Sequence, residues 1–341
     1  MKTVIQVLLG LGLLGALVFF LNPEQVAGVM SKITLTALTI LFSLQLLTLA
    51  AGAWIWHFLL NRRSRVSYAW VLVINQAAGL VESLTPSVKF GGEAAKVYLF
   101  RKITGQEYHA LTGILMVHKF ITMLPFSLLC LFLLIPALFY FNLPLSYVSA
   151  LIFVLAMSLS LGWLCYGKAS PRSCRTEEVG KNGNSRVPEQ ASSPVRKWIS
   201  KAALFLGQAR TSAAGLLSAG QTTRVLLVSL VIWIFYPLKV YLVCYFLNIE
   251  VSPVIIGLAT LFAYMISMAP LLPGGLGTYE GSMAMFFTLG GLSPAEGLAI
   301  ALVSRLTTFW FPLVLSSLAS LIIFRRFSFP GNDHGKNSFF S

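Results

Sequence analysis

The sequence predicts an all-α polytopic membrane protein, and three observations lead to this class. Hydrophobic side chains make up 57% of the 341 residues and charged ones only 11%, whereas a soluble chain carries about 25% charged residues. The mean hydropathy is +0.80. The apolar residues come in runs of about 20, which is the length of a helix that crosses a hydrocarbon core. A soluble globular protein is therefore excluded.

Nine apolar runs follow one another along the chain. They are 4–21, 33–60, 66–84, 110–141, 147–167, 224–247, 254–272, 282–290 and 298–324. The run 282–290 would rise only about 14 Å at 1.5 Å per residue, so it cannot cross a bilayer alone. The run 4–21 follows Lys2, but no small-residue cleavage site comes after it. We therefore expect a retained N-terminal anchor and not a signal peptide.

The distribution of positive charge predicts an orientation. The net charge is +14, from 25 Lys and Arg against 11 Asp and Glu. Basic residues collect in four segments, 62–65, 89–102, 168–224 and 325–326. Three connections carry none, 142–146, 248–253 and 291–296. Basic loops face the cytoplasm, so we expect both termini inside. The charge thus reflects orientation and does not indicate a nucleic-acid partner.

Each crossing helix carries the chain to the other side of the membrane. The predicted sides of the connections therefore require two segments that enter the membrane and leave on the same side. The connections before and after 66–84 are both basic, so this run would form one arm of a re-entrant hairpin. The connections before and after 254–290 carry no basic residue, so this segment would form a second hairpin from the opposite face. The prediction is six crossing helices plus two oppositely oriented re-entrant hairpins. In the alternative, eight crossings, Lys96, Arg101 and Lys102 would lie in or beyond the bilayer.

The two hairpin tips resemble each other. PSVKFGGE ends at Glu93 and PGGLGTYE ends at Glu280, so each places a Glu seven positions after a Pro. Lys119 follows the first Glu by 26 residues, and Arg305 follows the second by 25. Matching blocks that enter from opposite faces are typical of an inverted-topology repeat, whose substrate site lies near the midplane.

These blocks divide the chain into five parts, and the segment between the repeats shifts to Ser, Gly, Asn, Pro and charge. The parts are an N-terminal anchor helix and outer loop (1–32), a first membrane repeat with its tip at 85–93 (33–167), a cytoplasmic basic linker and amphipathic helix (168–223), a second membrane repeat with its tip at 273–281 (224–324) and a cytoplasmic tail (325–341).

Cations deep in predicted spans are the first candidate site residues. Arg305 and Lys119 lie well inside their helices, where a charge costs at least about 2.5–3.5 kcal/mol. We interpret both as contacting a lipid phosphate, which suits the bidentate geometry of Arg in particular. The alternative is a pair of internal ion pairs, Arg305 with Glu280 and Lys119 with Glu93. Lys239 lies eight residues from the outer end of its helix, and we expect its ammonium to reach the surface.

The second tip is the other candidate, because it is rich in glycine. Gly274, Gly275 and Gly277 after Pro273 permit close backbone approach. The half-helix beginning near Glu280 would direct free amides at an anionic headgroup. The alternative is an ordinary helical hairpin whose glutamates serve as N-terminal caps.

Four titratable residues are candidates for proton coupling, with a structural role as the alternative. A carboxylate or imidazole inside the membrane can exchange protons with the site it faces. The candidates are Glu93, Glu280, Glu82 and His118.

Motifs for catalysis are missing from the sequence. Asp333 is the only Asp, so no D-x-D nucleotide-sugar site or Asp-based Mg²⁺ cage is present. No H-E-x-x-H, G-x-S-x-G or Walker A motif occurs, and the four His show no metal-binding spacing. We therefore expect no catalysis, no metal and no cofactor.

The second half of the chain resembles a known family. The resemblance is carried by 270–281, 290–293, 299–305 and 309–312, and the first tip, 86–96, looks like the earlier signature of the same family. This is the flippase-like family that includes the membrane region of bacterial lysylphosphatidylglycerol synthases. It implies a protein that moves a lipid between leaflets. The positions that match its motifs are Pro273, Gly274, Gly277, Glu280 and Arg305, with Glu93 and Lys96 in the first tip. The synthases also carry a large soluble catalytic domain, which this sequence lacks after 298–324.

The predicted function is a flippase-like transporter of the bacterial inner (cytoplasmic) membrane. It would move an anionic phospholipid or a lipid-linked glycan headgroup between leaflets. One alternative is a membrane-embedded partner or subunit of a lipid-modifying transferase, without its own catalysis, and another is a structural assembly factor. The expected partners are the lipid and a lipid-modifying enzyme.

Overall fold

A computed structural model describes residues 23–85, 90–140, 194–268 and 272–328, with a few helical residues between 12 and 19 and between 149 and 163. Every regular element in these residues is a helix, which confirms the all-α class. The elements are α2 (Pro23–Met30), α3 (Leu35–Leu60), α4 (Tyr68–Leu84), α5 (Phe90–Thr104), α6 (Tyr108–Tyr140), α9 (Pro194–Ala213), α10 (Ala219–Phe246), α11 (Pro253–Ser267), η2 (Pro273–Gly275), α12 (Thr278–Leu289), α13 (Pro294–Arg305), η3 (Leu306–Trp310) and α14 (Phe311–Ser328).

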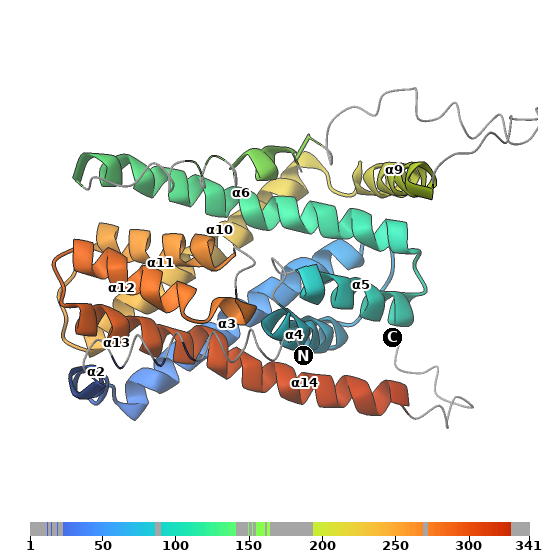
Figure 1. The fold of residues 1–341 in the computed structure, drawn as a ribbon. Coiled ribbons are helices and arrows are strands. Elements are labelled where there is room, and N and C mark those ends of the chain that lie inside the picture. Colours follow the sequence, from blue (N-terminus) through green and yellow to red (C-terminus); the bar gives the residue numbers. More distant parts are fainter. Residues whose placement is uncertain are drawn as a thin grey trace, which may run out of the picture.

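Four helices in the described ranges are long and apolar enough to cross a membrane. They are Leu35–Leu60, Tyr108–Ile135, Ala219–Phe246 and Pro294–Arg326. In Figure 1 they are α3, α6, α10 and the continuous pair α13 and α14. Four of the six predicted crossings are therefore present as long apolar helices. The other two, 4–21 and 147–167, lie largely outside the described residues.

The long helices form because their sequences are predominantly apolar and carry few charged residues. α3 carries no acidic or basic residue except His57 in its last turn, and it begins where the Thr34 side chain accepts a hydrogen bond from the Ala37 amide at 3.2 Å. It ends at Asn61, whose side chain accepts a hydrogen bond from the Val66 amide at 2.8 Å. A helix of this length with no charged residue before its last turn is typical of a membrane span.

Two pairs of short helices lie between the long ones in the chain. α4 and α5 have 17 and 15 residues, and α11 and α12 have 15 and 12. In each pair the two helices pack against each other. The order long helix, short pair, long helix therefore occurs twice, as α3 to α6 and as α10 to α14. The second arm of the second pair begins at Thr278, four residues before the predicted apolar run at 282.

Each short pair also packs against the last long helix of the other block. α4 packs against α14, and α11 packs against α6. Glycines permit both close approaches: a Cβ on Gly79 would lie 2.9 Å from Ser316 Oγ, and one on Gly257 would lie 2.7 Å from a methyl group of Leu133. Small residues at helix contacts are characteristic of membrane proteins.

The core is divided into two large hydrophobic clusters, one around each short pair. The first includes Trp56, Ile74 and Phe100, and the second includes Phe126 and Phe262. Figure 1 shows the α4 and α5 pair in one half of the molecule and the α11 and α12 pair in the other. The tip η2 contacts α4, so the second pair reaches the first near the middle.

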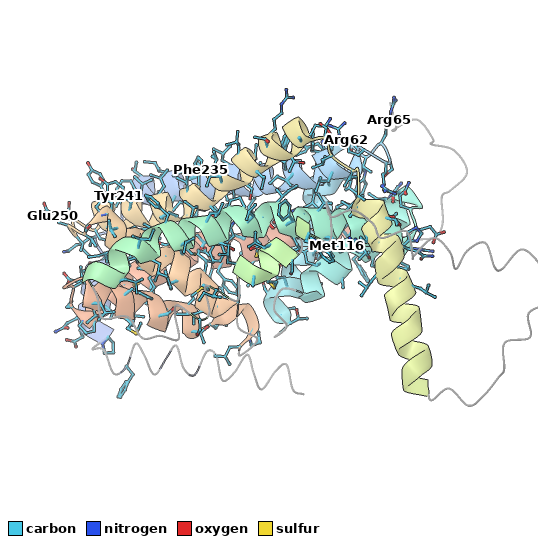
Figure 2. The ribbon with its side chains drawn as sticks, turned by 90° about the horizontal axis from the view of Figure 1, so that it is seen from above. Arg62, Arg65, Met116, Phe235, Tyr241 and Glu250 are labelled. Carbon is cyan, nitrogen blue, oxygen red and sulfur yellow. The ribbon has the colours of Figure 1, made fainter. Side chains whose placement is uncertain are left out.

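Charge is separated along the long helices. Figure 2 shows Arg62 and Arg65, after α3, at one end of the molecule and Glu250, after α10, at the other. α3 and α10 pack side by side, which brings the basic turn and the acidic loop to opposite ends. The apolar helices thus lie between one basic and one acidic end.

The helix predicted in the basic insert is present as α9 and packs against α6. A Cβ on Gly113 of α6 would lie 2.7 Å from the Ala209 carbonyl oxygen, so glycine permits this contact. Arg63 donates a hydrogen bond to the Ser212 carbonyl and ties α9 to the turn after α3. Leu204 and Leu206 of α9 remain exposed.

Candidate functional site

A polar cavity of about 250 Å³ lies where the two blocks meet. Its lining comes from both blocks, from α3, α4 and α5 on one side and from α10, α11, the η2 tip and the α13 to α14 helix on the other. The charged residues in this lining are Glu82, Lys96 and Arg305. Nearly half of the lining residues carry hydroxyl or amide side chains. The cavity is therefore a polar compartment among apolar helices.

The second tip is built from glycines in the left-handed region. Gly274, Gly275 and Gly277 have φ of 62°, 66° and 78°, a backbone conformation that residues other than glycine rarely adopt. A Cβ on Gly274 would lie 2.6 Å from the Phe309 ring, and one on Gly275 would lie 2.7 Å from Ser267 Cβ. Gly274 and Gly275 are therefore required both for the positive φ of the backbone and for the lack of space beside the neighbouring side chains. Gly274 and Gly275 line the cavity, while Pro273 is buried beside them.

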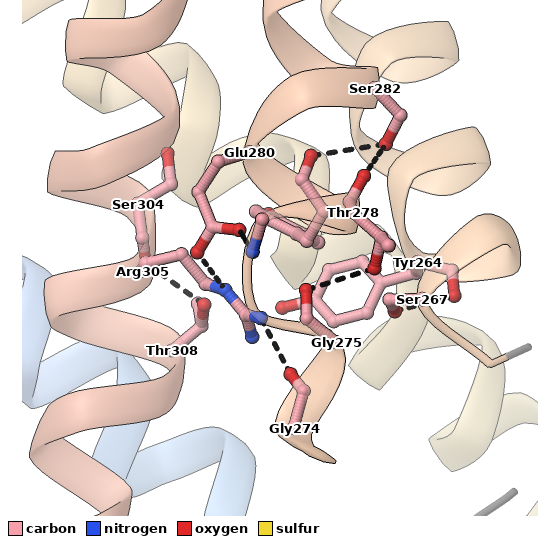
Figure 3. A network of polar contacts seen from close by, with 12 residues as sticks. Tyr264, Ser267, Gly274, Gly275, Thr278, Glu280, Ser282, Ser304, Arg305 and Thr308 are labelled. Carbon is pink, nitrogen blue, oxygen red and sulfur yellow. Dashed lines mark hydrogen bonds and ion pairs between the residues drawn. The ribbon is translucent and has the colours of Figure 1, made fainter. Parts of the chain in front are cut away.

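Glu280 and Arg305 hold this tip in place, as Figure 3 shows. Glu280 accepts hydrogen bonds from the Gly277 amide at 2.7 Å and from Arg305 Nε at 2.8 Å. Arg305 Nη2 also donates to the Gly274 carbonyl at 2.6 Å. Both side chains are buried, with 1% and 5% of their surface exposed. The ion pair therefore joins the start of α12 to α13 and to the glycine tip.

The Arg305 guanidinium contacts two aromatic rings. Its Cζ is 4.5 Å from the Tyr279 ring centroid and 4.6 Å from that of Phe309, both within cation–π range. A π-helical turn, η3, follows Arg305 directly, and such turns occur frequently at functional sites. Phe309 and Thr308 of this turn line the cavity together with Arg305.

The first short pair has an equivalent ion pair. Glu93, near the start of α5, lies 2.8 Å from Lys119 Nζ on α6 and 3.3 Å from Lys96 Nζ on its own helix. Lys96 lies 5.5 Å above the Trp56 ring, and His118 stacks on the same ring at 4.5 Å. The residues 86–89 of this tip lie outside the described residues. In both blocks, therefore, a Glu of the second short helix pairs with a basic residue of the next long helix.

The predicted site residues divide into two groups. Arg305, Lys96, Glu82, Gly274 and Gly275 line the cavity. The remaining ones are Lys119, Glu93, Glu280, His118, Pro273 and Gly277, which are outside this lining. The ion pairs considered as the alternative to lipid contact are both formed, which leaves Arg305 and Lys96 as the cations that also reach the cavity.

The position of Lys239 differs from the prediction. It was expected to reach the surface, but its side chain is buried with 2% exposed. Its Nζ donates to Gln45 Oε1 at 2.5 Å and to Thr48 Oγ1 at 3.3 Å, and it lies 4.3 Å from the Tyr236 ring centroid. The contact between α10 and α3 supplies these partners, and a single sequence does not show which helices are neighbours. Polar Gln45 and Thr48 within an apolar run were the available signal.

Two carboxamides were also missed. Asn75 and Gln76 lie in the middle of α4, are half-buried and line the cavity. Neither side chain has a hydrogen-bond partner in the part of the chain that the structure describes. An Asn followed by a Gln in an otherwise apolar run is visible in the sequence and would have indicated these two residues as candidate site residues.

Comparisons with known proteins give the family. The model of the lysylphosphatidylglycerol synthase TM region matches residues 4–316. A UPF0104 membrane protein of Methanothermobacter thermautotrophicus is 22% identical over 320 residues, which cover 91% of this chain and 92% of the relative. A UPF0104 membrane protein of Pyrococcus horikoshii is 20% identical over 330 residues, covering 94% and 97%. The chain is therefore an integral membrane protein that belongs to the family of the lysylphosphatidylglycerol synthase transmembrane region.

Proposed function

We propose that this protein is a flippase-like transporter that moves an anionic lipid or lipid-linked headgroup between the leaflets of the cytoplasmic membrane. The observation that carries the proposal is the polar cavity of about 250 Å³ shared by the two blocks, with Arg305 and Lys96 in its wall. A polar compartment with buried cations is costly among apolar helices. Glu93 and Glu280 compensate these cations in part, and a ligand phosphate would accept hydrogen bonds from the donors that the glutamates do not use.

The two blocks would form an inverted-topology repeat. The repeated order of helices and the two equivalent ion pairs, Glu93 with Lys119 and Glu280 with Arg305, support this arrangement. Each short pair would then be a re-entrant hairpin, and both tips would meet the cavity near the midplane. Transport would follow when one hairpin, then the other, moves away from the cavity and admits the headgroup from its own leaflet.

The charged residues would take different roles in this mechanism. Arg305 and Lys96 would bind the phosphate from the cavity wall, Arg305 with guanidinium donors that are not used by Glu280 or Gly274. Glu93 and Glu280 would hold these cations in position. Protonation of either carboxylate would free its partner, so proton movement could be coupled to the release of a hairpin.

Lipid transport into proteoliposomes tests the proposal. Purified protein is reconstituted with acyl-labelled fluorescent phospholipids, and reduction by external dithionite reports the leaflet of the label. Arg305→Leu and Lys96→Met should each lower the rate about 10- to 100-fold, the loss of one charge-assisted contact. Arg325→Met, at an exposed end of α14, should be unaffected. Equal rates for wild type, both variants and protein-free liposomes across anionic lipids would refute transport.

Cysteine labelling tests the hairpins. Single cysteines at Ser87, Asn142 and Ser293 are exposed to an impermeant maleimide in intact cells. In the re-entrant arrangement Ser293 and Asn142 react from outside and Ser87 does not. External labelling at Ser87 would contradict the first hairpin.

The family description favours one second candidate function. The matching family is named for the transmembrane region of a synthase, so the chain could be the membrane partner of a separate lipid-modifying transferase. Co-purification with such an enzyme, together with background lipid movement by the isolated chain, would favour this role.

A further inference from the structure

Three carboxamides at the cavity have hydrogen-bonding capacity that the described protein does not use. Asn75 and Gln76 of α4 line the cavity without a partner among the described residues. An unpaired amide in a membrane interior is costly, and each offers both a donor and an acceptor. Two adjacent residues of a helix point about 100° apart, so the cavity extends around this part of α4. Such a surface suits a ligand with several hydroxyl groups.

Lys239 orients the third carboxamide. Its ammonium donates to Gln45 Oε1 at 2.5 Å, which fixes the oxygen of Gln45 on the α10 side. The Gln45 amide nitrogen keeps its two donors for the cavity that this residue lines. Lys239 is therefore a positioning residue that makes Gln45 a donor toward the cavity.

Hydroxyl groups in the wall are arranged mainly as acceptors. Ser83, Ser267 and Thr308 donate their protons to carbonyls of their own helices, at 2.9, 2.8 and 2.8 Å. The oxygen lone pairs of Ser83 and Ser267 remain available in the cavity lining, whereas Thr308 also forms a side-chain hydrogen bond with Tyr264. Acceptors of this kind suit ligand hydroxyls, which can both donate and accept, while the carboxamides supply matching donors.

Two of the three charged side chains in the described lining are cations, Lys96 and Arg305, and the third is Glu82. Each cation is paired behind the cavity wall with a glutamate, Glu93 or Glu280, and keeps N–H donors that this partner does not use. A phosphodiester would accept hydrogen bonds from those donors. A headgroup with an added ammonium would place a further cation beside Lys96 and Arg305.

We propose that the cavity binds a lipid whose phosphodiester carries an uncharged, hydroxyl-rich headgroup. This inference rests on the proposed function and names the substrate class. The shared chemistry is one anionic phosphate and one polyol, whether glycerol, inositol or a sugar. The cavity of about 250 Å³ lies just below the usual volume range of ligand pockets, so the headgroup is limited to about one sugar. Lysyl and ethanolamine headgroups are poorer ligands because they bring an ammonium.

Ligand-dependent thermal unfolding of the purified full-length protein tests this class without requiring transport. The probes are dioctanoyl phosphatidylglycerol, dioctanoyl phosphatidylinositol and a short-chain polyprenyl phosphosugar, compared with phosphatidylethanolamine, lysylphosphatidylglycerol and phosphatidic acid. A polyol lipid at 100 times its Kd should raise the melting temperature by about 5 °C. The lipids with an ammonium should raise the melting temperature by less than half of this amount. Comparison of the three polyol lipids shows whether glycerol, inositol or a sugar is the preferred headgroup.

Two substitutions test the carboxamides. Asn75→Leu and Gln76→Leu replace each carboxamide with an apolar side chain. Each variant should bind polyol lipids about tenfold more weakly and phosphatidic acid less than twofold more weakly, because only the polyol contacts the amides. Gln208→Leu, on an exposed position of α9, is the matched control and should bind as wild type. If a Leu variant does not fold, the wild-type comparison of lipids decides alone.

The outcomes separate this inference from the proposed function. Stabilisation by lysylphosphatidylglycerol equal to that by phosphatidylglycerol, or unchanged polyol binding by both Leu variants, would overturn the polyol headgroup even if lipid is transported. The expected binding pattern without transport in proteoliposomes would overturn the flippase function and leave the headgroup class standing.

Discussion

Removing Arg305 should destabilise the glycine tip by leaving Glu280 buried and unpaired. In Arg305→Met the carboxylate keeps its hydrogen bond from the Gly277 amide but loses the guanidinium at 2.8 Å. Because Glu280 is 1% exposed, water cannot replace the lost partner. The Gly274 carbonyl loses its donor as well. The perturbation therefore acts on both sides of the tip.

The size of the stability loss follows from the burial of this ion pair. Breaking a buried ion pair by removing one partner costs about 3–5 kcal/mol, and the retained Gly277 hydrogen bond places the cost near 3 kcal/mol. At about 2 °C per kcal/mol for a chain of this size, the melting temperature should fall by about 6 °C. The double variant Arg305→Met with Glu280→Gln should recover at least half of the loss, because a neutral amide still accepts from the Gly277 amide.

Thermal unfolding in detergent, followed by intrinsic fluorescence, measures these shifts. Arg325→Met is the control, since an exposed cation should change stability by less than about 0.5 kcal/mol. A loss below about 2 °C for Arg305→Met, or a double variant whose loss equals the sum of the two single losses, would show that the pair does not hold the tip.

Two further substitutions test the packing around the cavity. Gly274→Ala should lower the free energy of unfolding by about 2 kcal/mol and abolish transport, because φ is 62° and the new Cβ would lie 2.6 Å from the Phe309 ring. The control is Gly207→Ala on α9, where the added Cβ meets open space. This variant should be neutral or slightly stabilising in the same melting assay. Lys239→Met should cost about 1–3 kcal/mol because the buried Gln45 oxygen loses its donor. Adding Gln45→Leu should restore stability, and no recovery in the unfolding midpoint would contradict this account.

Much of the fold could be predicted from the sequence because helices in a membrane satisfy their own backbone hydrogen bonds. Length and apolarity alone then indicate where the helices lie, as in Leu35–Leu60 and Ala219–Phe246. The partners of the buried charges could also be proposed. Glu93 with Lys119 and Glu280 with Arg305 followed from matching spacing in two blocks, and both pairs are formed.

The cavity could not be predicted in the same way. Its wall combines Asn75 and Gln76 of α4 with residues from the other block, such as Tyr264 and Thr308, and spacing along one chain does not show which helix faces are opposed. Lys239 shows the same limit, since its burial depends on Gln45 almost two hundred positions away. The sequence by itself determined the class, the long helices and the family. Only the tertiary structure decided which polar groups share the cavity, because that depends on packing between helices that are distant in the chain.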